Sequence, residues 1–318
     1  MPRSVLMDLQ HLLVVIDPTS EDDQPCLRRA AQLCDLYPEA DVTLFMVDYV
    51  PALDGGWLFD TPGLEKARAS LLEHHADNLE KLARAIRQKG NKVTTQAVWG
   101  KRRDRHILRA VSEHDPDLVL KTTHHHNPIK KLFLTNTDWE LIRHCEVPLW
   151  LVKKADDPLQ HICASVDPLH DADKPAALDR KLIGVADILA HKASAQLHIT
   201  HCYNPLPRTL VFDASVITDY DGYAGDVRDR HAKAFNEMAD NCGVDSEHSH
   251  LLQGYPEEAI PEFIEQHNIN LLIMGAVSRS RLDSALIGHT AERLLDEAGC
   301  DVLVVKPDDF VDPSKPEL

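Results

Sequence analysis

Leu12-Leu13-Val14-Val15-Ile16-Asp17-Pro18 is matched 150 positions later, from Asp17 to Asp167, by Ile162-Cys163-Ala164-Ser165-Val166-Asp167-Pro168. Both stretches are mostly apolar runs of strand length that end in an Asp-Pro step. At a spacing of 153, the segment from Thr137 to Lys153 matches the segment from Thr290 to Lys306. Because the repeated unit is far longer than a solenoid repeat, the sequence indicates two whole domains of common origin.

Each half alternates strand-like and helix-like segments in the same order. In the first half we expect strands at 12–16, 41–47, 92–98, 118–121 and 148–152, and helices at 24–37, 62–89, 105–113 and 137–144. In the second half we expect strands at 161–166, 196–202, 247–252, 271–274 and 302–306, and helices at 174–191, 221–241, 256–267 and 290–297. Apolar strands that alternate with helices predict a parallel sheet covered on both faces. Right-handed crossovers then give a doubly wound sheet of five strands per half.

The expected domains are residues 1–155 and 156–310, followed by an acidic tail at 311–318. Proline and acidic residues from Pro307 onward predict a disordered end. The formal net charge of −17 disfavours binding to the phosphate backbone of nucleic acids. No apolar run reaches the roughly 18 residues of a membrane span, and the N-terminal segment lacks the pattern of a signal peptide. The seven cysteines include no Cys-x-x-Cys pair, which fits a reducing compartment and a cytoplasmic protein.

The ends of the strands resemble those of the universal stress protein family. The residues that carry the resemblance are Asp17-Pro18, Asp167-Pro168, Leu272-Ile273-Met274-Gly275, Gly288-His289-Thr290-Ala291-Glu292-Arg293 and the last strand, 302–306. The resemblance covers nearly the whole chain, twice, and Thr137-Asp138-Trp139 is similar to bacterial members with two domains in one chain. It implies two tandem Rossmann-like (adenine nucleotide alpha hydrolase-like) domains, each a five-stranded parallel sheet. The implied role is a stress-response module that binds a ligand rather than a robust enzyme.

Family members that bind ATP carry Gly-x-x-Gly, then nine residues, then Gly-Ser/Thr. Glycines let the backbone approach phosphate oxygens, and the N–H groups at a helix N-terminus bind the anion. In the second half Gly275 and Gly288 match with the right spacing, whereas Ser278 replaces the middle glycine. The resemblance implies a site for a small anion such as ATP or AMP, with Asp167 accepting from ribose hydroxyls. The candidate residues are Val166, Asp167, Met274, Gly275, Ser278, Arg279, Gly288, His289 and Thr290.

In the first half the same motif is lost. Lys121 is expected where the first glycine belongs, and His124 or His125 where the second belongs. Thr135-Asn136 replaces Gly-Ser, with one residue inserted. We therefore expect no phosphate site there, and Asp17 is expected to form a turn. The resemblance also implies that the two domains pair within the chain, as in family dimers; a homodimer is left open.

Three alternatives stay open on the sequence. His124 and His126 are spaced to share a zinc ion, although zinc takes three or four ligands and the others are not identified; His201 and Cys202 form a second candidate pair. Apolar residues in two matching loops, Leu58-Phe59 and Val211-Phe212, suggest a lipid or acyl ligand. Slow ATP hydrolysis is the third alternative, although the sequence contains no nucleophile elbow, Walker A motif, His-Glu-x-x-His motif or kinase signature.

Overall fold

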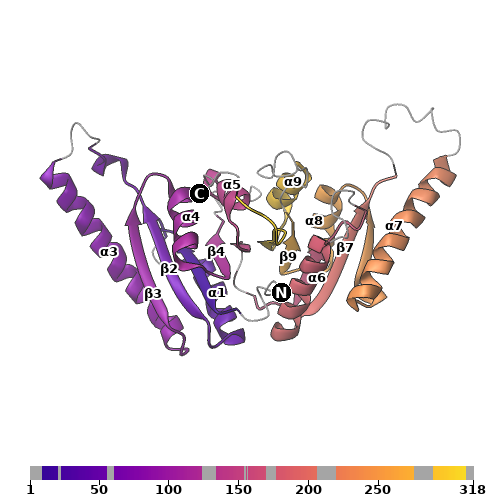
Figure 1. The fold of residues 1–318 in the computed structure, drawn as a ribbon, viewed down its shortest axis with the longest axis horizontal. Coiled ribbons are helices and arrows are strands. Elements are labelled where there is room, and N and C mark those ends of the chain that lie inside the picture. The colour runs from indigo at the N-terminus through magenta and orange to yellow at the C-terminus, as the bar shows by residue number, and fades with distance from the viewer. Residues whose placement is uncertain are drawn as a thin grey trace. The chain divides into compact units, whose positions relative to one another are not determined.

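The computed structural model describes residues 9–20, 23–55, 61–123, 134–153, 155, 157–169, 177–205, 220–275 and 289–312, and the statements below refer to these residues. Its contacts divide the chain into two compact units. One is Met1–Pro158 together with Asp312–Leu318, and the other is Leu159–Val311. Figure 1 shows that each unit has a sheet with helices on both sides.

The first unit alternates strands and helices as the sequence predicts. Its elements are β1 (His11–Ile16), α1 (Pro25–Leu36), β2 (Asp41–Asp48), the 3-10 helix η1 (Pro51–Leu53), α3 (Pro62–Arg87), β3 (Val93–Trp99), α4 (Arg103–His114), β4 (Leu118–Thr122), α5 (Asn136–His144) and β5 (Leu149–Val152). The strand order is β3-β2-β1-β4-β5, and the neighbouring strands run parallel.

The second unit repeats this order. Its elements are β6 (His161–Ser165), α6 (Ala177–Ala193), β7 (Gln196–Tyr203), α7 (Tyr220–Cys242), the 3-10 helix η3 (Ser246–His248), β8 (Ser249–Gln253), α8 (Pro256–Gln266), β9 (Leu271–Met274), α9 (His289–Glu297) and β10 (Asp301–Val304). The strand order is β8-β7-β6-β9-β10, again parallel. The predicted fold class is therefore confirmed.

The core of each unit lies around its central strands. All residues of β4 and β9 are buried, and β1 is buried from its second residue onward. In the first unit α1 packs against α3 and α4 against α5, and in the second α6 packs against α7 and α8 against α9. The chain reverses its winding between β1 and β4, and again between β6 and β9. In sheets of this kind, ligands bind beyond the carboxyl ends of those two strands.

The predicted disorder of the C-terminal segment is wrong for its described part, Pro307–Asp312. The Nδ1 atom of His144, near the end of α5, lies 2.7 Å from a carboxylate oxygen of Asp312. The backbone N–H of Asp312 donates to the Glu146 carboxylate at 3.3 Å. Lys181 of α6 pairs with Asp308 at 2.5 Å. Charged side chains, rather than apolar ones, fix this segment, which is why its composition suggested disorder.

Candidate functional site

In the second unit, the winding reverses where β6 and β9 lie side by side. Ile162 pairs with Leu271, and Ala164 with Ile273. Because the two strands are parallel, Asp167 and Gly275 follow them at the same edge of the sheet. The two predicted site residues that precede them, Val166 and Met274, are 5% and 4% exposed. They therefore contribute to the core, and their side chains are not open to a ligand.

Asp167 has a fixed backbone and an open side chain. Its N–H donates to a carboxylate oxygen of Asp179 at 3.1 Å, while its own side chain is 51% exposed. The corresponding Asp17 differs, because one of its carboxylate oxygens accepts from both the N–H and the hydroxyl of Thr19, at 2.9 and 2.8 Å. Leu169 follows Asp167 at the position of Thr19 and offers no hydroxyl. Asp17 thus forms the turn predicted for it, whereas Asp167 faces solvent.

Gly275 has a packing role that the sequence did not reveal. A Cβ atom at this position would lie 2.9 Å from the Cδ2 atom of Leu178, a buried residue in the first turn of α6. The absence of a side chain at Gly275 therefore lets α6 approach the end of β9 closely. In the first unit Thr122 is equivalent, and its hydroxyl accepts from the N–H of Cys26 in α1 at 3.0 Å.

Because Thr122 is equivalent to Gly275, the first glycine of the motif corresponds to Thr122 in the first unit. Lys121 pairs with Leu151 in the sheet of the first unit, as Met274 pairs with Val304 in the second. Lys121 is therefore equivalent to Met274, and the prediction that it replaces the first glycine is wrong. No residue is inserted, because Thr135 follows Thr122 at the same spacing as Gly288 follows Gly275.

Lys121 instead forms a buried ion pair. Its ammonium lies 2.7 Å from a carboxylate oxygen of Asp138, and the two side chains are 10% and 0% exposed. The ammonium also donates to the carbonyl of Thr122 at 3.0 Å. In the second unit the same two positions hold Met274 and Ala291. The ammonium of Lys121 and the carboxylate of Asp138 therefore neutralise each other at this edge of the first unit.

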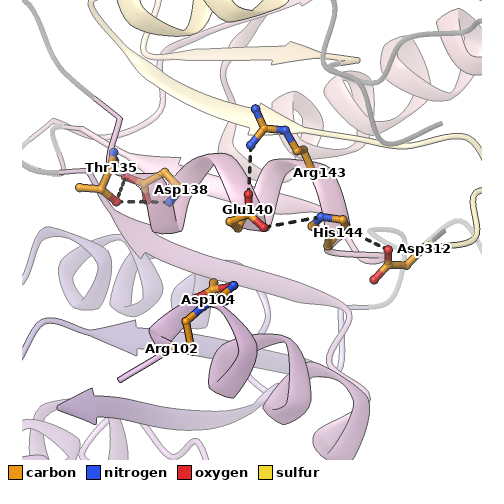
Figure 2. Close-up of polar contacts among 8 residues, drawn as sticks. All are labelled: Arg102, Asp104, Thr135, Asp138, Glu140, Arg143, His144 and Asp312. Atoms are coloured by element: carbon orange, nitrogen blue, oxygen red, sulfur yellow. Dashed lines mark hydrogen bonds and ion pairs between the residues drawn. The ribbon is translucent and has the colours of Figure 1, made fainter. Parts of the chain in front are cut away.

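The helices that follow this edge begin differently in the two units. Thr135 and Asp138 form a capping box at the start of α5: the Thr135 hydroxyl accepts from the Asp138 N–H, and the Asp138 carboxylate accepts from the Thr135 N–H at 2.7 Å. Figure 2 shows these two side chains facing each other at the start of the helix. The equivalent residues of α9 are Gly288 and Ala291. Gly288 and Ala291 have no side-chain oxygen, so these two residues cannot cap α9 as Thr135 and Asp138 cap α5.

The cavity at this edge of the first unit is small. Its lining includes Asp17, Arg103, Lys121, Thr122 and Thr135, and its volume is about 100 Å³. A water molecule occupies about 30 Å³ in the liquid, and pockets for small organic ligands have volumes of about 300–1,000 Å³. As lined by the described residues, the cavity is smaller than that range.

Several predicted residues lie outside the described part of the chain. They are Ser278, Arg279, Gly288, His124 and His126, and the two apolar loops 58–59 and 211–212 lie there as well. His289 and Thr290 begin α9, and the backbone alone is described for them. Within the described ranges, no group of three or more His, Cys, Asp or Glu residues is arranged to hold a metal ion. None of the described helices is long and apolar enough to cross a membrane.

His201 and Cys202 do not form the predicted metal-binding pair. They are neighbours on β7, so their side chains point to opposite faces of the sheet. His201 is 2% exposed and its Nδ1 atom lies 3.1 Å from the carbonyl oxygen of Val166. Burial raises the pKa of the Cys202 thiol to about 12, so it stays protonated at neutral pH. The sequence signal for the pair was its position near the end of the second strand of this half, which is β7.

The sequence did not reveal a cluster of histidines near the amino ends of the strands in the second unit. Its members are His161, His198, His248, His250 and His267. The two ring nitrogens of His198 lie 3.3 Å from His161 and 3.1 Å from His250. Its ring centre is 5.6 Å from that of His248 and 5.9 Å from that of His267. Burial, together with the neighbouring histidines, lowers the pKa of both His198 and His250 to about 4. His248 and His250 are two residues apart, but the other three come from separate segments, so no short sequence motif marks the whole cluster.

Comparisons with known proteins agree with this architecture. A model of the universal stress protein family matches residues 9–153 and again 159–306. Universal stress protein E of Photorhabdus laumondii is 29% identical over 315 residues, which cover 98% of this chain and 99% of the relative. The protein of the same name from Salmonella typhi is 30% identical and covers 96% of both chains. The crystal structure of a putative universal stress protein from Pseudomonas aeruginosa has a TM-score of 0.73 at 26% identity, with 95% of each chain covered. The chain therefore belongs to the universal stress protein family and carries two domains of that family.

Proposed function

We propose that the second domain binds a small anionic ligand of the adenine nucleotide class, ATP or AMP, as part of a stress response. The first domain has no such ligand. The observation that carries the proposal is the difference between the two helix N-termini. In α5 the first N–H groups and the nearby ammonium are satisfied by Thr135 and Asp138. In α9 the equivalent Gly288 and Ala291 supply no acceptor.

Two further features support this assignment. The N-terminus of a helix carries partial positive charge, which favours a phosphate group when no side chain occupies the position. Asp167, at the end of the adjacent β6, has an exposed carboxylate that can accept from ribose hydroxyls. Asp17 of the first domain accepts from Thr19, and the cavity beside it has a volume of about 100 Å³.

Transferring the capping box of α5 to α9 tests the proposal. The variant Gly288→Thr/Ala291→Asp places a hydroxyl and a carboxylate where we expect the phosphate. Isothermal titration with ATP and with AMP should show at least about tenfold weaker binding than the wild type, because the added carboxylate repels phosphate and occupies the N–H donors. Thr and Gly differ by only a few tenths of a kcal/mol as N-cap residues, so the variant should unfold close to the temperature of the wild type.

Asp167→Asn and Asp17→Asn form a matched pair of controls. Asp167→Asn should weaken nucleotide binding severalfold, since an amide is a poorer acceptor than a carboxylate. Asp17→Asn should leave nucleotide affinity unchanged. If the wild type binds neither ATP nor AMP, or if the two variants behave alike, the proposal is wrong.

A further inference from the structure

His201 contacts the backbone just after β6, next to Asp167. Its Nδ1 atom lies 3.1 Å from the carbonyl oxygen of Val166. A carbonyl oxygen only accepts hydrogen bonds, so Nδ1 must carry the proton and donate it. The tautomer of neutral His201 is thereby fixed, and its Nε2 atom is left as an acceptor.

The partner of Nε2 comes from α7. The Nδ1 atom of His231 lies 2.7 Å from it, and the two rings are nearly parallel with centres 5.0 Å apart. Phe235 and Tyr203 lie beside the pair, with ring centres 5.8 Å from His201 and His231 respectively. His201 is therefore fixed in position between β6 and α7.

These contacts hold the backbone around Asp167. The carbonyl of Val166, just before it, accepts from His201, and its own N–H donates to Asp179. The backbone on both sides of the Asp167 side chain is thus held by side chains from β7 and α6. One Asp167 carboxylate oxygen lies 3.9 Å from the Nδ1 atom of His201, close enough for the charge of His201 to act on it.

The first domain lacks this arrangement. Ile16 pairs with Met46 in the register of β1 and β2, and the registers of β6 and β7 place His201 at the position of Met46. A thioether has no proton to donate to the backbone of β1. His201 is thus present in the domain with the open aspartate and absent from the domain whose aspartate forms a turn.

We propose that His201, oriented by His231, is a positioning residue that fixes Asp167 for ligand binding and makes the affinity of the second domain depend on pH. This inference rests on the proposed function. When the pair takes up a proton, a cation faces Asp167 and draws its carboxylate away from the ligand. The charged groups that act on the pair are Asp167 on the β6 side, Asp179 of α6 and Arg230 of α7.

The sign of the pH dependence follows from the environment of the two rings. Burial lowers the pKa of both His201 and His231, and each lies below the ordinary histidine value of 6.5. The pair is therefore neutral at pH 7.5 and gains a proton only below the ordinary histidine value of 6.5. Affinity for the nucleotide should be full at neutral pH and fall once the solution is acidic enough to protonate the pair, which happens below pH 6.5.

The experiment compares wild type with His201→Met, which installs the residue of the first domain, and with His201→Gln, which keeps an N–H donor. ATP affinity is measured at pH 7.5 and pH 5. Between pH 7.5 and pH 5, the ATP affinity of wild type should fall by about threefold or more beyond the fall seen in His201→Met, because only wild type can gain a charge at position 201 beside Asp167. Protonation of the phosphates affects all three proteins equally and cancels in the ratio. His201→Gln should keep most of the affinity at pH 7.5 and lose the difference in pH dependence.

A ligand-free measurement separates this inference from the proposed function. In histidine NMR titrations, Asp167→Asn should lower the pKa of His201, since the carboxylate stabilises its charged form. Should wild type bind no nucleotide while this shift is present, the proposed function fails, and the contact between His201 and Asp167 stands without a role in binding. An unchanged pKa of His201 in Asp167→Asn, or equal pH dependence in wild type and His201→Met, would overturn the positioning role itself.

Discussion

Replacing Lys121 with Met, the residue at the equivalent position of the second domain, is expected to lower the free energy of unfolding of the first domain by about 3–5 kcal/mol. The substitution leaves the carboxylate of Asp138 without its ammonium partner at a site where Asp138 is fully buried. An unpaired charge in such a position is far more costly than the loss of an exposed ion pair, which is worth about 0–1 kcal/mol.

The double variant Lys121→Met/Asp138→Ala copies the Met274 and Ala291 of the second domain. This variant removes both charges. We expect it to recover most of the lost free energy of unfolding, except for about 1 kcal/mol because Asp138 no longer caps α5. Urea unfolding followed by tryptophan fluorescence measures this directly, because all four tryptophans (Trp57, Trp99, Trp139 and Trp150) precede the second domain. If the double variant were no more stable than Lys121→Met, the buried ion pair would not be the cause.

Acidification is expected to destabilise the second domain through its histidine cluster. His198 is 5% exposed, and the four charges with the largest effect on it all belong to other histidines. With a folded pKa of about 4 for His198 and His250 and an unfolded value of about 6.5, the unfolded state binds more protons between these two values. Stability is therefore complete above pH 6.5 and falls as the pH drops toward 4.

Between pH 8 and pH 5, the free energy of unfolding should fall by about 2 kcal/mol for each histidine that is fully shielded from solvent. His250 is partly exposed, so solvent screening reduces its contribution to this fall. His198 and His250 together should account for about 2–3 kcal/mol. Amide hydrogen exchange by mass spectrometry, corrected for the intrinsic pH dependence of exchange, reports this loss in peptides from β6 to β9. Peptides from β1 to β4 serve as the internal reference.

His198→Leu/His250→Leu is the matched variant. It removes the two shifted groups, so the protection of β6 to β9 should change much less between pH 8 and pH 5 than in wild type. Equal changes in the two proteins would mean that the acid sensitivity arises from groups outside the histidine cluster.

The fold was predictable because its signals are local and repeated. The apolar runs of β1 and β6 end in the same Asp-Pro step, and the long helix predicted at 62–89 is α3 (Pro62–Arg87), capped by the Thr61 hydroxyl. The strand predicted at 247–252 begins later, at Ser249, because Ser246–His248 forms a 3-10 turn first. Turns of this kind depend on a few hydrogen bonds that apolar spacing does not reveal.

The placement of two candidate residues was predictable. Asp167 and Gly275 follow neighbouring parallel strands, which place their carboxyl ends at one edge of the sheet. Lys121 was placed one residue off as the substitute for the first glycine, although the 153-residue spacing of the repeat already sets it opposite Met274, as the strand pairing does. The roles of His201 and Leu178 could not be found from the sequence, because each depends on a contact between elements that are far apart along the chain.

The contact between His144 and Asp312 has a consequence for how the protein is made. The two residues are 168 positions apart, and most of that interval, Leu159–Val311, forms the second unit. At 5–20 residues per second, a ribosome needs roughly 8–34 s to synthesise that interval. The nascent first domain can assemble its sheet during this delay, but the carboxyl end of α5 acquires its carboxylate partner only when synthesis reaches Asp312.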